Sequence, residues 1–226
     1  MRRLFDDELA ELDADFTEMG MLVSETIEQA VSSFTNRDAV AAQQIIDHDH
    51  KINEREIALE KKTFEMIALY QPVTTDLREI VTILKAVSEL ERAGDHARNI
   101  AHATIKFGTK QKIPVLEQLL NQMGLMTTQM VKDVLAAYVD KNDHEARKLA
   151  DVDRQLDQLN HQVRADSYAQ MRSDPAFETG ASIYLNVAQD LSRIGDYVTN
   201  VCEWIVYLKS GQIIELNTAS QDGETA

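Results

Sequence analysis

A segment of eleven residues occurs twice in this chain, 101 residues apart, and this repeat constrains the fold more than any other feature. The first copy, residues 90–100, reads LERAGDHARNI, and the second, residues 191–201, reads LSRIGDYVTNV. Arg, Gly, Asp and Asn recur in one register inside apparent helices. A helix-interior glycine costs about 1 kcal/mol relative to alanine, so its recurrence indicates a required local geometry. The repeat divides the chain into two copies of one unit.

The repeat extends to the other helices at an offset of 104, because residues 19–20, 34 and 47–49 match 123–124, 138 and 151–153. Apolar residues recur every three or four positions, which is typical of amphipathic helices. The pattern predicts six helices, near residues 6–35, 38–69, 74–107, 113–139, 143–171 and 177–209. We therefore expect an all-α protein of two tandem antiparallel three-helix bundles. Their predicted ranges are 1–110 and 111–211, followed by a polar tail over 212–226 that frays from about Asn217.

The charge and composition limit the kinds of partner and compartment. The formal net charge is −15, and both halves of the chain are acidic. Nucleic-acid binding normally needs a basic stripe, so no nucleic-acid partner is expected. No apolar leader follows Met1, and no uncharged run approaches the ~20 residues that span a bilayer. Cys202 is the single cysteine and cannot form an intramolecular disulfide. We expect a cytoplasmic protein without membrane insertion.

Oxygen-bearing side chains occur in pairs on the faces of the second and third helices of the repeats. An aspartate in an apolar helix seam is unusual, because an unpaired buried carboxylate is costly. Three pairs lie four residues apart on one helix: Asp49 with Asn53, Asp153 with Asp157, and Glu91 with Asp95. The simpler interpretation is that these groups are solvated or paired with arginines such as Arg55, Arg92 and Arg154. The alternative is an oxygen-rich site for a hard or borderline metal ion.

Two segments resemble a known family. Residues 90–101, LERAGDHARNIA, resemble the hallmark segment of PhoU proteins, which are accessory regulators of phosphate-specific transport. Residues 71–78, QPVTTDLR, resemble the segment that opens the third helix in that family. The resemblance covers the chain up to about Gly211. It implies two tandem three-helix bundles, metal ions bound by Glu/Asp-x-x-x-Asp motifs, and a regulatory role without catalysis.

The resemblance also implies a set of metal ligands. By position they are Asp49, Asn53, Glu91 and Asp95 in the first repeat, and Asp153, Asp157 and Asp196 in the second. Asn53 stands where a carboxylate is common, Ser192 replaces the motif's glutamate, and Tyr197 replaces the histidine seen at His96. We therefore expect the second site to be weaker than the first, or to bind a different number of ions. Oxygen ligands on helices do not distinguish iron, zinc, manganese and magnesium.

The family implies a negative regulator of the phosphate-starvation response. Its expected partners are the ATPase subunit of a phosphate ABC transporter and a sensor histidine kinase, and a homodimer is expected. Asp76 and Arg78, at the start of the third helix, are candidate partner contacts. A metal-binding helical adaptor is the alternative. A carboxylate-bridged di-metal enzyme is disfavoured, because none of the six histidines follows a glutamate by three residues.

Overall fold

The computed structural model describes residues 2–216, and the regular elements in that range are helices. They are α1 (Arg2–Asn36), α2 (Ala39–His48), α3 (His50–Tyr70), α4 (Thr74–Phe107), α5 (Pro114–Val139), α6 (Asp143–Ser173), the 3₁₀ turn η1 (Pro175–Phe177) and α7 (Glu178–Ser210). The all-α prediction is confirmed. The part of the predicted tail from Asn217 onward lies outside the described residues.

The single helix predicted over residues 38–69 is wrong, because the chain forms two helices that meet at Asp49. Asp38 begins α2 by accepting hydrogen bonds from the backbone N–H groups of Val40 and Ala41. The His50 ring pairs with the Asp47 carbonyl oxygen at 2.9 Å, which satisfies a backbone group at the end of α2. In the second repeat, α6 continues without a break through the equivalent position.

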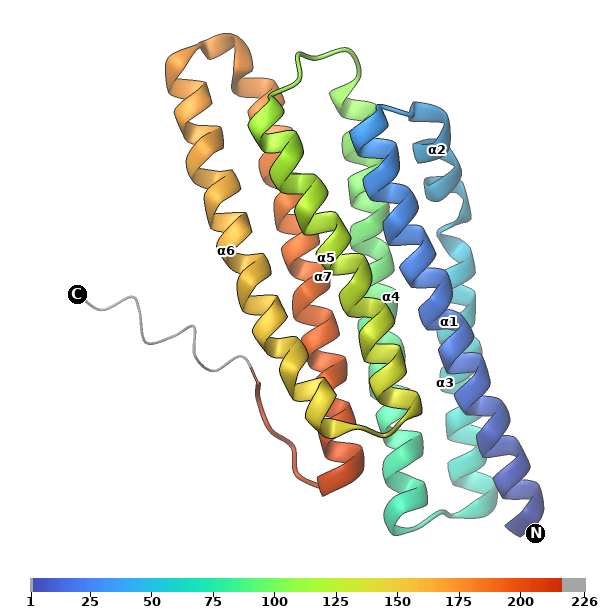
Figure 1. Ribbon diagram of the computed structural model, residues 1–226. Coiled ribbons are helices and arrows are strands. Elements are labelled where there is room, and N and C mark those ends of the chain that lie inside the picture. The colour runs from blue at the N-terminus through green and yellow to red at the C-terminus, as the bar shows by residue number, and fades with distance from the viewer. Residues whose placement is uncertain (1, 217–226) are drawn as a thin grey trace.

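The two repeats lie side by side and share one hydrophobic core (Figure 1). α1 packs against α5, and α4 packs against α7, so each repeat contributes its first and third helices to the shared interface. α3 and α6 lie on the outer flanks (Figure 1). Cys202 is buried in this core. Within residues 2–216, no helix is long and apolar enough to cross a membrane.

Two repeated glycines allow the first helices of the repeats to approach. Gly20 on α1 faces the side chain of Leu135 on α5, and Gly124 on α5 faces Val31 on α1. Both glycines and both facing residues are related by the offset of 104. The two repeats therefore meet through equivalent surfaces in an antiparallel arrangement, as an approximate two-fold relation requires.

The glycines of the repeated eleven-residue segment likewise allow two helices to pack closely within each repeat. A Cβ atom at Gly94 would lie 2.8 Å from Ile52 Cδ1, and one at Gly195 would lie 2.7 Å from Leu156 Cδ2. Ile52 and Leu156 are equivalent positions of the second helices. The glycines thus bring the second and third helices of each repeat together at the level of the predicted metal ligands.

Ion pairs tie the repeats together at both ends of the shared interface. Arg37 and Lys141 are equivalent residues in the turn after the first helix of each repeat, and both have a positive φ, 58° and 48°. Arg37 reaches across to Glu117 and donates to the Tyr184 hydroxyl at 2.8 Å. Lys141 reaches across to Glu79, which is 4% exposed. These contacts join the turn after α1 to α5 and α7, and the turn after α5 to α4.

Candidate functional site

The predicted ligands of the first repeat lie between α3 and α4, around one arginine. Arg98 donates to Asp49 through Nη1 and to Asp95 through Nη2, the latter at 2.9 Å. Asp49 sits at the break between α2 and α3, and its carboxylate contacts Arg98 on α4. Arg98 therefore joins the second and third helices of this repeat by ion pairs, as the simpler interpretation of these carboxylates expected, although with a different arginine.

Glu91 lies one turn before Asp95 on α4 and carries the most perturbed carboxyl of this cluster. Burial raises its pKa to about 7, with further contributions from the negative charges of Asp95, Glu56 and Asp49, while Arg98 opposes the shift. A carboxyl that is held neutral by burial and like charges is stabilised in its ionised form by any added cation. Glu91 is thus the position where a bound metal would relieve the largest electrostatic penalty.

Glu56 is a member of this cluster that sequence reasoning missed. Burial raises the pKa of Glu56, and the nearby charges of Glu60 and Asp95 add to the effect. Asn53, a predicted ligand, lies on the same helix and is half-buried. Positions 49, 53 and 56 follow the spacing of one helix face, so extending the pair by one turn would have found Glu56. We call Asp49, Asn53, Glu56, Glu91 and Asp95 the first carboxylate cluster.

The second carboxylate cluster, formed by Asp153, Asp157 and Asp196, lies at the equivalent place between α6 and α7. Asp153 is 1% exposed, and its side chain contacts the space beside Gly195. The Ser192 hydroxyl donates to Asp157 at 2.6 Å. Ser192, which stands where the first repeat has Glu91, therefore contributes a hydrogen-bond donor in place of a fourth carboxylate.

Asp196 is the electrostatically perturbed member of the second cluster. Burial raises its pKa, the charge of Asp157 adds to the increase, and Arg193 and His96 lower it. Arg193 donates to Asp196 at 3.2 Å. Asp157 on α6 and Asp196 on α7 therefore lie near enough for the charge of one to act on the other.

One histidine connects the two repeats between the clusters. His96 Nδ1 pairs with an oxygen of Asp190 on α7 at 2.8 Å. The His96 ring also packs against Tyr197, with ring centroids 5.6 Å apart. The two residues that differ at this motif position thus contact each other across the α4–α7 interface. This places the two carboxylate clusters on adjoining helices of one interface.

The donor atoms of the first cluster suit a hard cation, because carboxylate and amide oxygens are the ligands such ions prefer. Within residues 2–216, however, no three His, Cys, Asp or Glu side chains are gathered closely enough to hold a metal ion. Arg98 instead holds Asp49 and Asp95. Metal binding would require the arginine to release these carboxylates and Glu91 to turn toward them.

Asp76 and Arg78, the predicted partner contacts, are half-buried at the start of α4. Arg78 donates to the Thr75 hydroxyl at 3.4 Å. Its guanidinium also lies against Gly211, where an added Cβ would be 2.7 Å from Nη1. Gly211 ends α7 with a φ of 74°, and a cation at a helix C-terminus is favourable. Arg78 therefore has an intramolecular role besides any contact with a partner.

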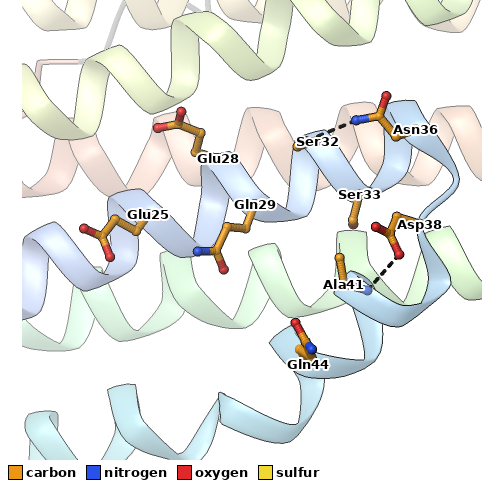
Figure 2. Close-up of a pocket in the computed structure, with 9 residues that line it drawn as sticks. All are labelled: Glu25, Glu28, Gln29, Ser32, Ser33, Asn36, Asp38, Ala41 and Gln44. Atoms are coloured by element: carbon orange, nitrogen blue, oxygen red, sulfur yellow. Dashed lines mark hydrogen bonds between the residues drawn. The ribbon is translucent and has the colours of Figure 1, made fainter.

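A separate acidic groove of about 510 Å³ lies between α1 and α2 (Figure 2). Glu25, Glu28 and Asp38 supply its charges. Asp38 is engaged in capping α2, and Asn36 donates to the Ser32 hydroxyl at 3.2 Å (Figure 2). This groove lies apart from the motif glycines and carries none of the predicted ligands.

The fold and the two acidic clusters define a class of protein: a tandem repeat of three-helix bundles with a carboxylate cluster between the second and third helices of each repeat. A family model described as the PhoU domain matches the chain twice, at residues 16–104 and 120–205. The chain belongs to the PhoU family.

Relatives and solved structures of this family align with nearly the whole chain. A phosphate-specific transport system accessory protein PhoU homolog of Streptococcus pneumoniae is 36% identical over 96% of this chain and 100% of its own length. The Clostridium acetobutylicum homolog is 33% identical over 96% of this chain and 99% of its own. The crystal structure of the S. pneumoniae regulatory protein PhoU superposes with a TM-score of 0.88 at 33% identity, covering 93% of this chain and 99% of that one.

Proposed function

We propose that the protein is an accessory regulator of phosphate-specific transport and a negative regulator of the phosphate-starvation response. The observation that carries the proposal is the double PhoU-domain match, together with relatives named as phosphate-specific transport accessory proteins over nearly their full length. In this role it links the ATPase subunit of a phosphate ABC transporter to a sensor histidine kinase.

The proposal assigns no catalytic step to the protein. The names of its relatives describe accessory and regulatory proteins. The chemistry of the clusters also favours binding, because each combines carboxylates with arginine or serine partners. Regulation then depends on which surfaces the two bundles present and how firmly the helices are held together.

We further propose that the first carboxylate cluster binds a divalent or transition metal ion. Glu91 and Asp95 would be its principal ligands, with Asp49, Asn53 and Glu56 from the facing helices. Bound metal would supply positive charge where burial and neighbouring carboxylates raise the pKa of Glu91 to about 7. Because the proposed ligands come from both helices, the bound metal would fix the orientation of α3 against α4. The second cluster, with Ser192 in place of a glutamate, would bind more weakly.

The regulatory role is tested by deleting the gene and measuring an alkaline phosphatase reporter in high phosphate. Deletion should switch the reporter on, and the wild-type gene should switch it off again. The Glu91→Ala, Asp95→Ala double variant should restore repression only in part. A Glu25→Ala, Glu28→Ala variant removes two carboxylates from the groove of Figure 2 and should repress normally. An unchanged reporter in the deletion strain would contradict the regulatory role.

The partners are tested with purified components. The ATPase subunit and the cytoplasmic region of the kinase should each bind the full chain in a calorimetric titration. Arg78→Ala and Asp76→Ala variants test whether the start of α4 contributes to either surface. Light scattering of the free protein tests the homodimer expected from the sequence. Failure of both components to bind would remove the linking role.

A further inference from the structure

A polar groove of about 340 Å³ lies at the interface between α4 and α7. One of its lining residues is Asp190, the partner of His96. It lies on the third helices of both repeats, so each helix of the interface supplies one wall. The residues that line it are Asn99, His102, Ala103 and Lys106 from α4, and Ile183, Asn186, Gln189 and Asp190 from α7. Its volume is within the range of small-molecule sites.

The internal repeat shows why this groove exists. An offset of 101 relates Ala103 to Trp204, so the equivalent place at the other end of the interface carries an indole where the groove has a methyl group. There, Lys85 lies over the Trp204 ring at 5.9 Å, and the Thr82 hydroxyl donates to the Trp204 carbonyl oxygen at 3.3 Å. The chain therefore fills one copy of this position and leaves the other open.

The polar groups of the filled copy are also paired within the chain. Asn200 donates to Glu89 at 2.9 Å, and Glu203 accepts the backbone N–H of Leu216 at 2.7 Å. Their counterparts in the groove are Asn99, Asp190 and His102. Within residues 2–216, the side chains of Asn99 and His102 make no hydrogen bond or ion pair. The open copy thus leaves Asn99 and His102 without a side-chain partner among the described residues, whereas the filled copy pairs Asn200 and Glu203 within the chain.

The charges in the groove favour an anion at one end. Lys106 makes no ion pair with the part of the chain that the structure describes, and His102 lies one turn away on the same helix. Asp190, the carboxylate of the lining, is already paired with His96 at 2.8 Å. By contrast, the groove between α1 and α2 is lined by three acidic residues and no cation (Figure 2). In a chain of net charge −15, an anion needs such a local cation.

We propose that the α4–α7 groove binds a small ligand that carries a phosphate group. Lys106 and His102 would contact the phosphate oxygens, and the amides of Asn99, Asn186 and Gln189 would donate further hydrogen bonds. Free phosphate and a phosphorylated metabolite share this chemistry. Binding is a property of the purified chain, so the inference does not rest on the proposed regulatory role.

The test titrates three probes into the metal-free full chain by calorimetry: inorganic phosphate, AMP and adenosine. Phosphate, AMP or both should bind in a saturable way, and adenosine should not. Equal affinities for phosphate and AMP assign the free ion, and tighter binding of AMP assigns a phosphorylated metabolite; both results support the proposal. Absence of saturable binding at millimolar phosphate and AMP, or equal binding of AMP and adenosine, would overturn it.

Variants locate the binding in the groove. Lys106→Gln should weaken the affinity about tenfold, because a charged hydrogen bond to the phosphate is lost. Lys85→Gln, on the same helix but outside the groove, should leave the affinity unchanged. Ala103→Trp copies the residue of the filled position and should abolish binding, with circular dichroism as the check of folding. Asn186→Ala is the second variant if the tryptophan disturbs the fold. Wild-type affinity in Lys106→Gln would contradict the assignment.

Discussion

The two carboxylate clusters occupy equivalent places in the two repeats but balance their charge in different ways. In the first, Arg98 bridges Asp49 and Asp95, and Glu91 is left with a pKa raised to about 7. In the second, Ser192 removes one negative charge and donates to Asp157 at 2.6 Å. One substitution thus converts a cluster with an excess of charge into one that is partly satisfied internally. We therefore expect the first cluster to bind a cation more tightly than the second.

The largest expected difference is in metal content. Removing Glu91 and Asp95 together by alanine substitution should lower metal affinity of the first cluster at least tenfold, since two principal ligands are lost. An Asp157→Ala, Asp196→Ala variant should lower the total bound metal much less. Elemental analysis after reconstitution, followed by calorimetry, measures both. Metal-free wild-type protein after reconstitution would contradict metal binding, and equal losses would contradict the inequality of the clusters.

Alanine substitutions of the glycines beside the two clusters should also change the stability of the fold by different amounts. Gly195→Ala should destabilise the fold by about 1–3 kcal/mol, because the new methyl group meets the buried Asp153 side chain and Leu156. Gly94→Ala should change stability by less than about 1 kcal/mol, because Ile52 Cδ1 is the end of a flexible side chain and alanine favours the helix. Urea unfolding measures both variants. A larger loss for Gly94→Ala would reverse the comparison.

Ser192→Glu supplies the second cluster with the carboxylate that the first has at Glu91. We expect metal affinity of this cluster to rise about tenfold and metal-free stability to fall, because a further negative charge joins Asp157 and Asp196. Calorimetry in the Glu91→Ala, Asp95→Ala background reports the second cluster separately. The control is Ser192→Gln, because glutamine has nearly the same size as glutamate but carries no charge. Equal affinities for the two variants would show that the missing charge is not the cause.

The smallest effect concerns pH. The Glu91 carboxyl has a pKa of about 7 in the folded protein, against an ordinary value of 4.5. The folded state therefore keeps this proton up to a higher pH than the unfolded chain does. The free energy of unfolding consequently falls as the pH rises from about 4.5 to about 7. For a partly exposed side chain, the wild type should lose about 2–4 °C more than Glu91→Gln over that interval. Thermal scans in chelator at both ends of the interval measure the difference, and parallel curves would refute the role of Glu91.

Much of the fold follows from local patterns that the sequence displays. Helix type, helix order and the internal repeat depend on apolar spacing, caps and glycine positions, which act within a few residues. The prediction failed at Asp49, where the helix is divided. The His50 ring and the distant Arg98 favour the break, and neither contact is visible in hydrophobic periodicity.

The candidate site was predicted in part for the same reason. Glu91 and Asp95 share one face of α4, so their proximity is expected from spacing alone, whereas the approach of Asp49 to them is a contact between different helices. Glu56 belongs to the same face one turn further on, and its membership depends on how closely α3 approaches α4.

The sequence by itself determined that this chain is a duplicated, all-helical protein of the PhoU family with paired oxygen-bearing side chains in each half. Only the tertiary structure decided how those groups are partnered: Arg98 between two carboxylates, Ser192 on Asp157, and His96 on Asp190 of the other repeat. It also decided that one copy of the α4–α7 interface is open, beside Ala103, while Trp204 occupies the other. Side-chain partners depend on packing between distant helices, whereas helix formation depends on near neighbours.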